Sequence, residues 1–248
     1  DAVVAVGGGV VGDLAGFAAA SYMRGIDFYN IPTTFLSQVD SSIGGKTAIN
    51  LEGVKNIIGA FYQPKKVLID PEVLRTLPQR QLSSGLAESV KMAATFDKEL
   101  FEMIERGDIE ENLDTVIEKS LAIKKYVVEH DEKESGLRRV LNFGHTIGHG
   151  IESCEGLHGL YHGECVALGM LPMCSAPVRE RLTHIYEKIG LPAALDFDPE
   201  RVFEAVTHDK KLDGNLIHLV FVPEIGTYEM KTMTLHDFHT MIKEAFSS

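Results

Sequence analysis

The sequence has few cysteines, no tryptophan and no long apolar run. Its 248 residues include three cysteines, Cys154, Cys165 and Cys174, an odd number with no CxxC pair. We therefore expect free thiols in a reducing cytoplasm. No run approaches the roughly 18 apolar residues of a spanning helix, and no signal peptide is visible. These absences predict a cytoplasmic protein with no membrane partner.

Basic residues are also scarce. Lysine and arginine number 24 against 36 aspartates and glutamates, which gives a net charge of -12. This balance argues against nucleic acid or an anionic membrane as the main partner. An anionic substrate remains compatible, because local basic clusters can oppose the net charge. The apolar fraction of 44% is ordinary for a protein with a real core.

The first eighty residues have the pattern of an α/β fold. Apolar runs at 2–6, 27–31 and 66–70 predict buried strands, and an alanine-rich helix is expected at about 10–22. Alternation of such strands with helix predicts a parallel sheet. Residues 41–64, rich in glycine, asparagine and lysine, resemble a functional loop region.

Helical patterns dominate after Pro78, and a short hairpin at about 217–231 and a last helix from about Leu235 follow them. The predicted fold class is therefore α/β plus all-α. We expect a partial Rossmann-like parallel-sheet domain at 1–79 and a mainly helical domain at 80–248.

A glycine turn separates the first strand from the first helix. Gly7, Gly9 and Gly12 satisfy GxGxxG. Without Cβ atoms the backbone can approach a pyrophosphate, and the helix N-terminus offers unpaired N–H groups. A tight turn without a ligand is the alternative. The flanking strand and helix favour phosphate or dinucleotide binding.

Two further patterns are weaker on their own. Residues 40–47 resemble a P-loop but lack the GxxxxGK[ST] spacing, which excludes an ATPase. Lys46 and Lys55 suit anion binding there, and solvated loop lysines are an equal alternative. Glu88 and Lys91 lie three apart on one face of an expected helix, where a surface ion pair is the simpler interpretation.

Histidines supply the strongest chemical signal. His145 and His149 are four residues apart, as are His158 and His162, and glycines flank them. On a helix such pairs lie one turn apart, and histidine is an excellent metal ligand. Two such spacings favour a metal or catalytic site over hydrogen-bonded core histidines. The pattern does not choose which histidines bind.

Taken together, the motifs resemble those of the 3-dehydroquinate synthase family from residue 2 to about residue 230. The matching segments are 7–13, 32–34, 40–46, 55–56, 77–78, 85–91, 138–149, 162–164 and 209–211, in order. The resemblance implies an NAD-binding domain followed by a metal- and substrate-binding domain. It also implies NAD and one Zn²⁺ or Co²⁺ as cofactors, and a homodimer. The family converts 3-deoxy-D-arabino-heptulosonate 7-phosphate, a sugar phosphate, to 3-dehydroquinate in the shikimate pathway.

The resemblance also implies roles for individual residues. The metal ligands would be Glu88, His145 and His162, and the catalytic positions His149, Glu134 and Lys91. Substrate-binding positions would be Arg24 (toward a neighbouring subunit), Asp40, Lys46, Asn56, Lys124, Arg138, Asn142, and one of Lys210 and Lys211. NAD positions would be Gly8, Gly9, Val10, Asp13, Thr33, Thr34, Lys55, Thr76 and Leu77.

Other interpretations compete with this one. A related sugar-phosphate cyclase would share the NAD and metal sites, although Arg24, Lys124 and Arg138 favour the dehydroquinate type. A polyol dehydrogenase usually offers Asp as its carboxylate ligand. A non-catalytic module is a third possibility, because the chain opens directly into a strand after Asp1. The family's first roughly one hundred residues are expected to be absent, so we also expect weak NAD binding and little turnover from this chain alone.

Overall fold

A computed structural model describes residues 1–52, 54–109, 111–155, 159–209 and 214–246. The chain forms two compact units. Unit 1 comprises Asp1–Leu86 and Asn112–Arg138, and unit 2 comprises Ala87–Glu111 and Arg139–Ser248. The expected division after residue 79 stays a prediction. The two units differ from it chiefly because residues 112–138 belong to the unit that contains the N-terminal part.

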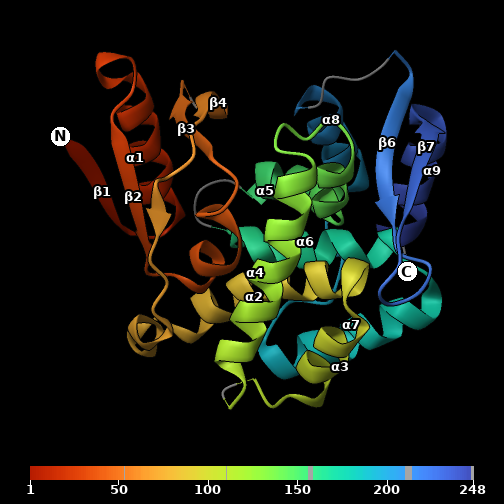
Figure 1. Ribbon diagram of the computed structural model, residues 1–248. Helices are drawn as coiled ribbons and strands as arrows, with labels where there is room; N and C mark the ends of the chain where they lie inside the picture. The colour runs from red at the N-terminus through yellow and green to blue at the C-terminus, as the bar shows by residue number, and fades with distance from the viewer. Residues whose placement is uncertain (53, 110, 156–158, 210–213, 247–248) are drawn as a thin grey trace. The chain divides into compact units, whose positions relative to one another are not determined.

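A small parallel sheet organises unit 1. Strands β1 (Ala2–Gly7), β2 (Asp27–Pro32) and β5 (Lys66–Val67) pair in the order β1-β2-β5. Helix α1 (Gly9–Ser21) lies beside β1 and β2 (Figure 1). Ala5, Ala19 and Phe28 form the buried core between the sheet and this helix. The expected partial Rossmann-like arrangement is therefore confirmed.

The expectation of a loop region at 41–64 was wrong for most of that segment. Strands β3 (Lys46–Leu51) and β4 (Val54–Phe61) form an antiparallel pair. Thr47 Oγ1 donates to the Ala60 carbonyl at 2.8 Å. A Cβ at Gly59 would lie 2.3 Å from the Thr47 carbonyl, so this glycine allows the close strand contact.

Short helices and one long helix complete unit 1. The short ones are η1 (Tyr22–Arg24), the π-helical η2 (Ser37–Ser41) and η3 (Pro71–Thr76). Helix α4 (Leu113–His130) packs against η2. Helix α2 (Gln79–Phe96) begins in unit 1 and continues into unit 2, and η4 (Leu137–Asn142) likewise spans the second junction.

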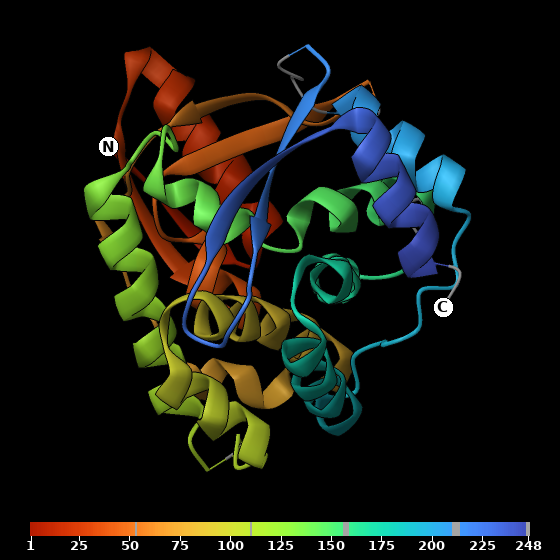
Figure 2. The same ribbon diagram turned by 90° about the vertical axis from the view of Figure 1, so that its right-hand side faces the viewer.

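Unit 2 is mainly helical, as predicted. Its other helices are α3 (Lys98–Arg106), α5 (His145–Glu155), α6 (His162–Met170), η6 (Leu171–Met173), α7 (Ala176–Ile189), α8 (Pro199–Asp209) and α9 (Leu235–Phe246). Strands β6 (Leu216–Phe221) and β7 (Glu229–Thr234) form the expected hairpin. Helices α8 and α9 pack side by side (Figure 2). No helix in the described residues is long and apolar enough to cross a membrane.

Glycines let α5 and α6 approach at backbone distance. A Cβ at Gly169 would lie 2.0 Å from the Gly144 carbonyl, and one at Gly148 would lie 2.9 Å from the Cys165 carbonyl. These contacts are with backbone atoms, which cannot rotate away. The close crossing sets the first residue of α6, His162, against the face of α5 that carries His145 and His149.

We expect Gly169→Ala to destabilise unit 2. The added methyl would force the two helices apart, and such overpacking costs about 1–3 kcal/mol. Thermal unfolding should show a lowered Tm. Gly136→Ala is the control, because its Cβ would meet only Asp131 Oδ2 at 3.9 Å. Equal Tm values for the two variants would contradict the packing account.

Candidate metal centre and anion-binding residues

Three side chains from separate helices converge in unit 2. Glu88 of α2 places Oε1 3.5 Å from His145 Nε2 and 3.4 Å from His162 Nε2. One ligand atom from each residue lies within 4.8 Å of the other two. A carboxylate and two imidazoles are a donor set that zinc commonly takes in proteins.

The Glu88 carboxylate is fully buried, and its two oxygens have different surroundings. Oε2 accepts an ion-paired hydrogen bond from Lys91 Nζ, and both side chains are at most 2% exposed. Oε1 makes no hydrogen bond to the described residues. A buried oxygen without a partner is costly, so this oxygen and the two imidazole nitrogens facing it form a donor set that suits a cation.

Each imidazole is held through its other nitrogen. His145 Nδ1 lies 3.2 Å from the Phe143 carbonyl, and His162 Nδ1 lies 3.4 Å from Glu152 Oε2. A carbonyl and a carboxylate accept hydrogen bonds, so the proton resides on Nδ1 in both contacts. The Nε2 atoms are then turned toward Glu88 Oε1.

The cluster shifts the pKa values of its members. Burial alone would raise the pKa of Glu88, but the Lys91 ammonium and the two imidazoles bring it well below its usual range. Burial and the Lys91 charge lower the pKa of His145 well below its usual value. Burial would also lower the pKa of His162, yet its contacts with the Glu152 and Glu88 carboxylates raise it to about 9. His145 is therefore neutral at pH 7, whereas His162 is held by two carboxylates.

His149 lies beside the three converging residues. Its ring centroid is 5.3 Å from that of His145 and 5.8 Å from that of His162. His149 also belongs to a second possible ligand group, with Glu152 and His162. The structure thus gathers all three histidines, and the sequence spacing did not decide between these groups.

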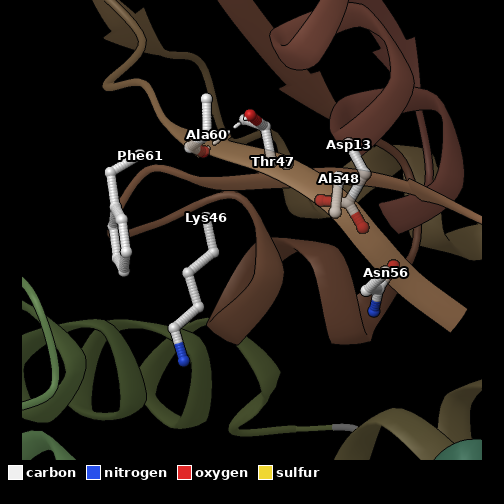
Figure 3. A pocket seen from close by; sticks show the side chains of 8 residues that line it. Asp13, Lys46, Thr47, Ala48, Asn56, Ala60 and Phe61 are labelled. Carbon is white, nitrogen blue, oxygen red and sulfur yellow. Dashed lines mark hydrogen bonds between the residues drawn. The ribbon is translucent and has the colours of Figure 1, made fainter.

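Unit 1 contains a pocket of about 350 Å³. Three residues expected to bind cofactor or substrate, Asp13, Lys46 and Asn56, line it together with parts of β3 and β4. Figure 3 shows Asp13 and Ala48 among the side chains that line the pocket, while the Lys46 side chain extends away from the strand. Burial raises the pKa of Asp13 to about 6.

The glycine turn is closely packed against the segment after β2. A Cβ at Gly8 would lie 2.9 Å from Thr34 Cγ2, and one at Gly9 would lie 3.2 Å from Ser41 Oγ. The Thr33 N–H donates to the Gly7 carbonyl at 2.9 Å. The N-cap residue of α1, Gly8, has no side chain with which to cap the helix. The glycines therefore form a close-packed strand-to-helix turn, and phosphate binding there stays a prediction.

The lysines expected to bind substrate are ion-paired in unit 1. Lys46 pairs with Glu134, and Lys124 pairs with Asp40 at 2.5 Å. Arg138 is 2% exposed, and its guanidinium donates to the Gly44 and Glu132 carbonyls. The structure brings together predicted acidic and basic residues that lie far apart in the sequence.

The remaining expected positions have less distinctive surroundings. Arg24 is exposed with a left-handed φ of 68°, and Asn56 has a φ of 52°. Val10 is 83% exposed at the start of α1. Lys55 lies in β4, Thr76 ends η3 with Leu77 next to it, and Asn142 ends η4. Lys210, Lys211 and His158 lie outside the described residues.

Two residues in contact with expected site residues were missed in the sequence. Asp131 accepts hydrogen bonds from the backbone N–H groups of Ser135, Gly136 and Arg138 at 2.7–3.0 Å. The signal was an Asp after a helix and before Ser-Gly, as in an Asx-type turn. Glu152 was the other, and its signal was the spacing of three from His149 on one helix.

Comparisons with known proteins agree with this arrangement. A family model for the N-terminal part of 3-dehydroquinate synthase matches residues 1–84, and one for the C-terminal part matches residues 85–212. The 3-dehydroquinate synthase of Streptococcus sanguinis is 45% identical, over 98% of this chain and 73% of its own length. The chain belongs to the 3-dehydroquinate synthase family. The Citrifermentans bemidjiense family member is 47% identical over 94% of this chain and 68% of its own length.

Solved structures of related cyclases have the same fold. A 2-epi-5-epi-valiolone synthase from Streptomyces hygroscopicus, with NAD⁺ and Zn²⁺ bound, has a TM-score of 0.89 and 28% identity, covering 98% of this chain and 72% of that one. A 2-deoxy-scyllo-inosose synthase, complexed with carbaglucose-6-phosphate, NAD⁺ and Co²⁺, has a TM-score of 0.86 and 29% identity, covering 98% and 74%. A probable glycerol dehydrogenase from Sinorhizobium meliloti shares the fold more distantly. It has a TM-score of 0.63 and 20% sequence identity, covering 100% of this chain and 77% of that one.

We expect Asp131→Asn to loosen the segment 132–138. Partial burial raises the pKa of Asp131, but the backbone N–H groups it binds bring the net value well below its usual range. The charged form therefore holds the segment, and the asparagine should raise amide exchange of Ser135, Gly136 and Arg138 by roughly 3- to 10-fold.

The pH dependence follows from the sign of this shift. Because the folded pKa is depressed, the stabilisation is complete above the unfolded value of about 3.9 and is lost as pH falls through the lower folded value. Hydrogen-exchange mass spectrometry should thus find wild type and variant converging below pH 4. Glu129→Gln, the same charge change on exposed α4, is the control. Exchange at 135–138 that is equal in all three proteins at pH 7 would overturn the assignment.

Proposed function

We propose that this chain converts 3-deoxy-D-arabino-heptulosonate 7-phosphate to 3-dehydroquinate and phosphate. Oxidation of a ring hydroxyl acidifies the neighbouring C–H, phosphate leaves by β-elimination, and reduction, ring opening and an intramolecular aldol reaction follow. Two features support the proposal: the membership of the family and the convergence of Glu88, His145 and His162 on one buried point. The convergence carries the most weight. Glu88 Oε1 is buried and makes no hydrogen bond to the described residues. Such an oxygen is costly unless it binds something, and a chain that had lost the chemistry would have no reason to keep it.

We propose that Glu88, His145 and His162 hold Zn²⁺ or Co²⁺. The unpartnered Glu88 Oε1 and the two Nε2 atoms turned toward it fit such an ion, and related cyclases were solved with these metals. When bound, the metal supplies Lewis acidity toward the substrate hydroxyls. Lys91 neutralises the other oxygen of Glu88 and so fixes which oxygen faces the ion.

The NAD site is proposed at the glycine turn and the neighbouring pocket of unit 1. When bound, NAD accepts a hydride from a substrate carbon and returns it within one turnover. The uncapped N-terminus of α1 suits the pyrophosphate. The proposed contacts are Gly8, Gly9, Val10, Asp13, Thr33, Thr34, Lys55, Thr76 and Leu77.

Basic and amide side chains are proposed to bind the substrate anion. Lys46 offers an exposed ammonium beside the pocket, and Arg138 offers a guanidinium fixed by backbone carbonyls. Asp40, Asn56, Lys124, Asn142, and one of Lys210 and Lys211 complete the proposed set. A homodimer, in which Arg24 reaches the neighbouring subunit's substrate, and a cytoplasmic location are proposed with it. The free thiols support a reducing compartment.

Catalytic roles are proposed for His149, Glu134 and Lys91. The His149 ring lies beside the rings of both imidazole ligands, and an imidazole nitrogen can carry a proton to or from substrate. Glu134 pairs with Lys46, and its carboxylate is the proposed proton acceptor. Lys91, buried against Glu88, supplies a fixed charge.

A different cyclase is the second candidate, because two solved neighbours make other carbocycles. Sequence identity favours the first candidate. The chain is 28–29% identical to those two solved cyclases and 45–47% identical to the 3-dehydroquinate synthases. The deciding experiment supplies NAD and Zn²⁺ and measures phosphate release and carbocycle formation. Heptulosonate phosphate and sedoheptulose phosphate are compared as substrates. Turnover of the second alone would replace the proposed substrate, and turnover of neither would favour the non-catalytic module.

We expect Glu88→Gln, His145→Ala and His162→Ala each to lose metal. Removing a ligand should weaken Zn²⁺ affinity by more than the roughly 10–100-fold that outer-shell changes cause. Competition against a chromophoric chelator measures the affinity. The exposed His236 of α9 provides the control His236→Ala. Unchanged affinity in His162→Ala, with loss in a His149→Ala protein, would move the metal to the second group.

We expect His149→Ala to keep its metal and lose most turnover. A general acid–base group typically contributes roughly 10²–10⁴-fold to the rate. Steady-state kinetics and metal content should be measured on the same sample. A parallel fall in metal content and activity would show that His149 is a ligand and would contradict the assigned role.

A further inference from the structure

Glu152 has no role in the site described so far, yet it lies in contact with one proposed ligand. It follows His145 and His149 on α5 by seven and three residues, so the three side chains share one face of the helix. Its side chain is 17% exposed, and Oε2 lies 3.4 Å from His162 Nδ1. Glu152 therefore contacts His162 on the side of the ring away from Glu88.

The two imidazoles are anchored by different acceptors. His145 Nδ1 faces the Phe143 carbonyl, a backbone group whose position is fixed by the chain. His162 opens α6 as its first residue, with 31% of its side chain exposed against 13% for His145. His145 likewise opens α5, so the difference between the two rings is the greater exposure of the His162 side chain. Glu152 supplies the anchor that the local backbone supplies for His145.

We propose that Glu152 is a positioning residue, which holds the Nδ1–H of His162 so that Nε2 is aimed at the metal. This proposal rests on the proposed function, since it takes Glu88, His145 and His162 as the ligands. A carboxylate that accepts from a ligating imidazole fixes the tautomer and increases the electron density at the other nitrogen. Glu152 would therefore raise metal affinity without touching the ion.

The same residues allow one rival arrangement. Glu152, His149 and His162 also have ligand atoms within 4.8 Å of one another, so Glu152 could itself be a ligand. Two observations favour the positioning role. Glu88 Oε1 is the buried oxygen that makes no hydrogen bond, whereas the Glu152 contact with Nδ1 has hydrogen-bond geometry.

The test measures Zn²⁺ affinity by chelator competition and the visible absorption of the Co²⁺ form. Glu152→Ala should weaken affinity roughly 10- to 100-fold and leave the Co²⁺ absorption of its saturated form unchanged in pattern. Glu152→Gln keeps an acceptor oxygen and the side-chain shape, so it should lose less affinity than the alanine variant. Glu187→Gln, the same charge change on an exposed residue of α7, should bind like wild type.

Each other outcome has a definite meaning. Affinity of Glu152→Ala equal to that of Glu187→Gln, in a protein whose His162→Ala variant loses metal, would overturn the positioning role and leave the metal site standing. A changed Co²⁺ spectrum in Glu152→Ala would make Glu152 a ligand. Failure of wild type and His162→Ala to differ would instead reject the proposed metal site. If Glu152→Ala has a lowered Tm, the Zn²⁺ affinity of Glu152→Gln is compared with that of wild type instead. Equal affinities would then overturn the positioning role, and a weaker affinity of the variant would support it.

Discussion

The structure of unit 2 depends on keeping one carboxylate charged where no water reaches it. An isolated buried ion carries a penalty of several kcal/mol, and a close pair offsets this only with good geometry. Glu88 meets the condition with Lys91 on one oxygen and two imidazoles facing the other. The high pKa of His162 is the electrostatic signature of that demand, because positive charge is favoured beside Glu88. A divalent cation satisfies the same demand more completely than a proton.

Close helix packing makes this arrangement possible. Glu88 belongs to α2, His145 to α5 and His162 to α6, so three separate helices must meet. Gly144, Gly148 and Gly169 remove the Cβ atoms that would keep α5 and α6 apart. The glycines that flank the histidines in the sequence therefore do not bring a ligand to the backbone. They bring one helix backbone to another, and the imidazoles follow.

Local patterns in the sequence were sufficient for most elements and insufficient for the site. The strand runs at 2–6 and 27–31 and the helices after Pro78 were recognisable because each has its own period. The β3–β4 pair was missed because Gly, Asn and Lys interrupt the alternation, while the pairing depends on Gly59 and Thr47 meeting across strands. For the histidines, the spacing of His145 and His149 placed both on one helix face. Glu88 and His162 lie on two other helices, so no local spacing in the sequence relates them to His145. Only the tertiary fold, or the family resemblance, places them in the same site.

The ion pairs also indicate which lysines are free to change partner. Lys91 and Lys124 have side chains 2% and 8% exposed, and each is paired with a carboxylate. Breaking such a buried pair typically costs about 3–5 kcal/mol, so both lysines act as fixed charges. Lys46 is 52% exposed in its pair with Glu134, and exposed pairs contribute only about 0–1 kcal/mol. Of these three, Lys46 is therefore the one that an incoming phosphate or carboxylate can recruit cheaply.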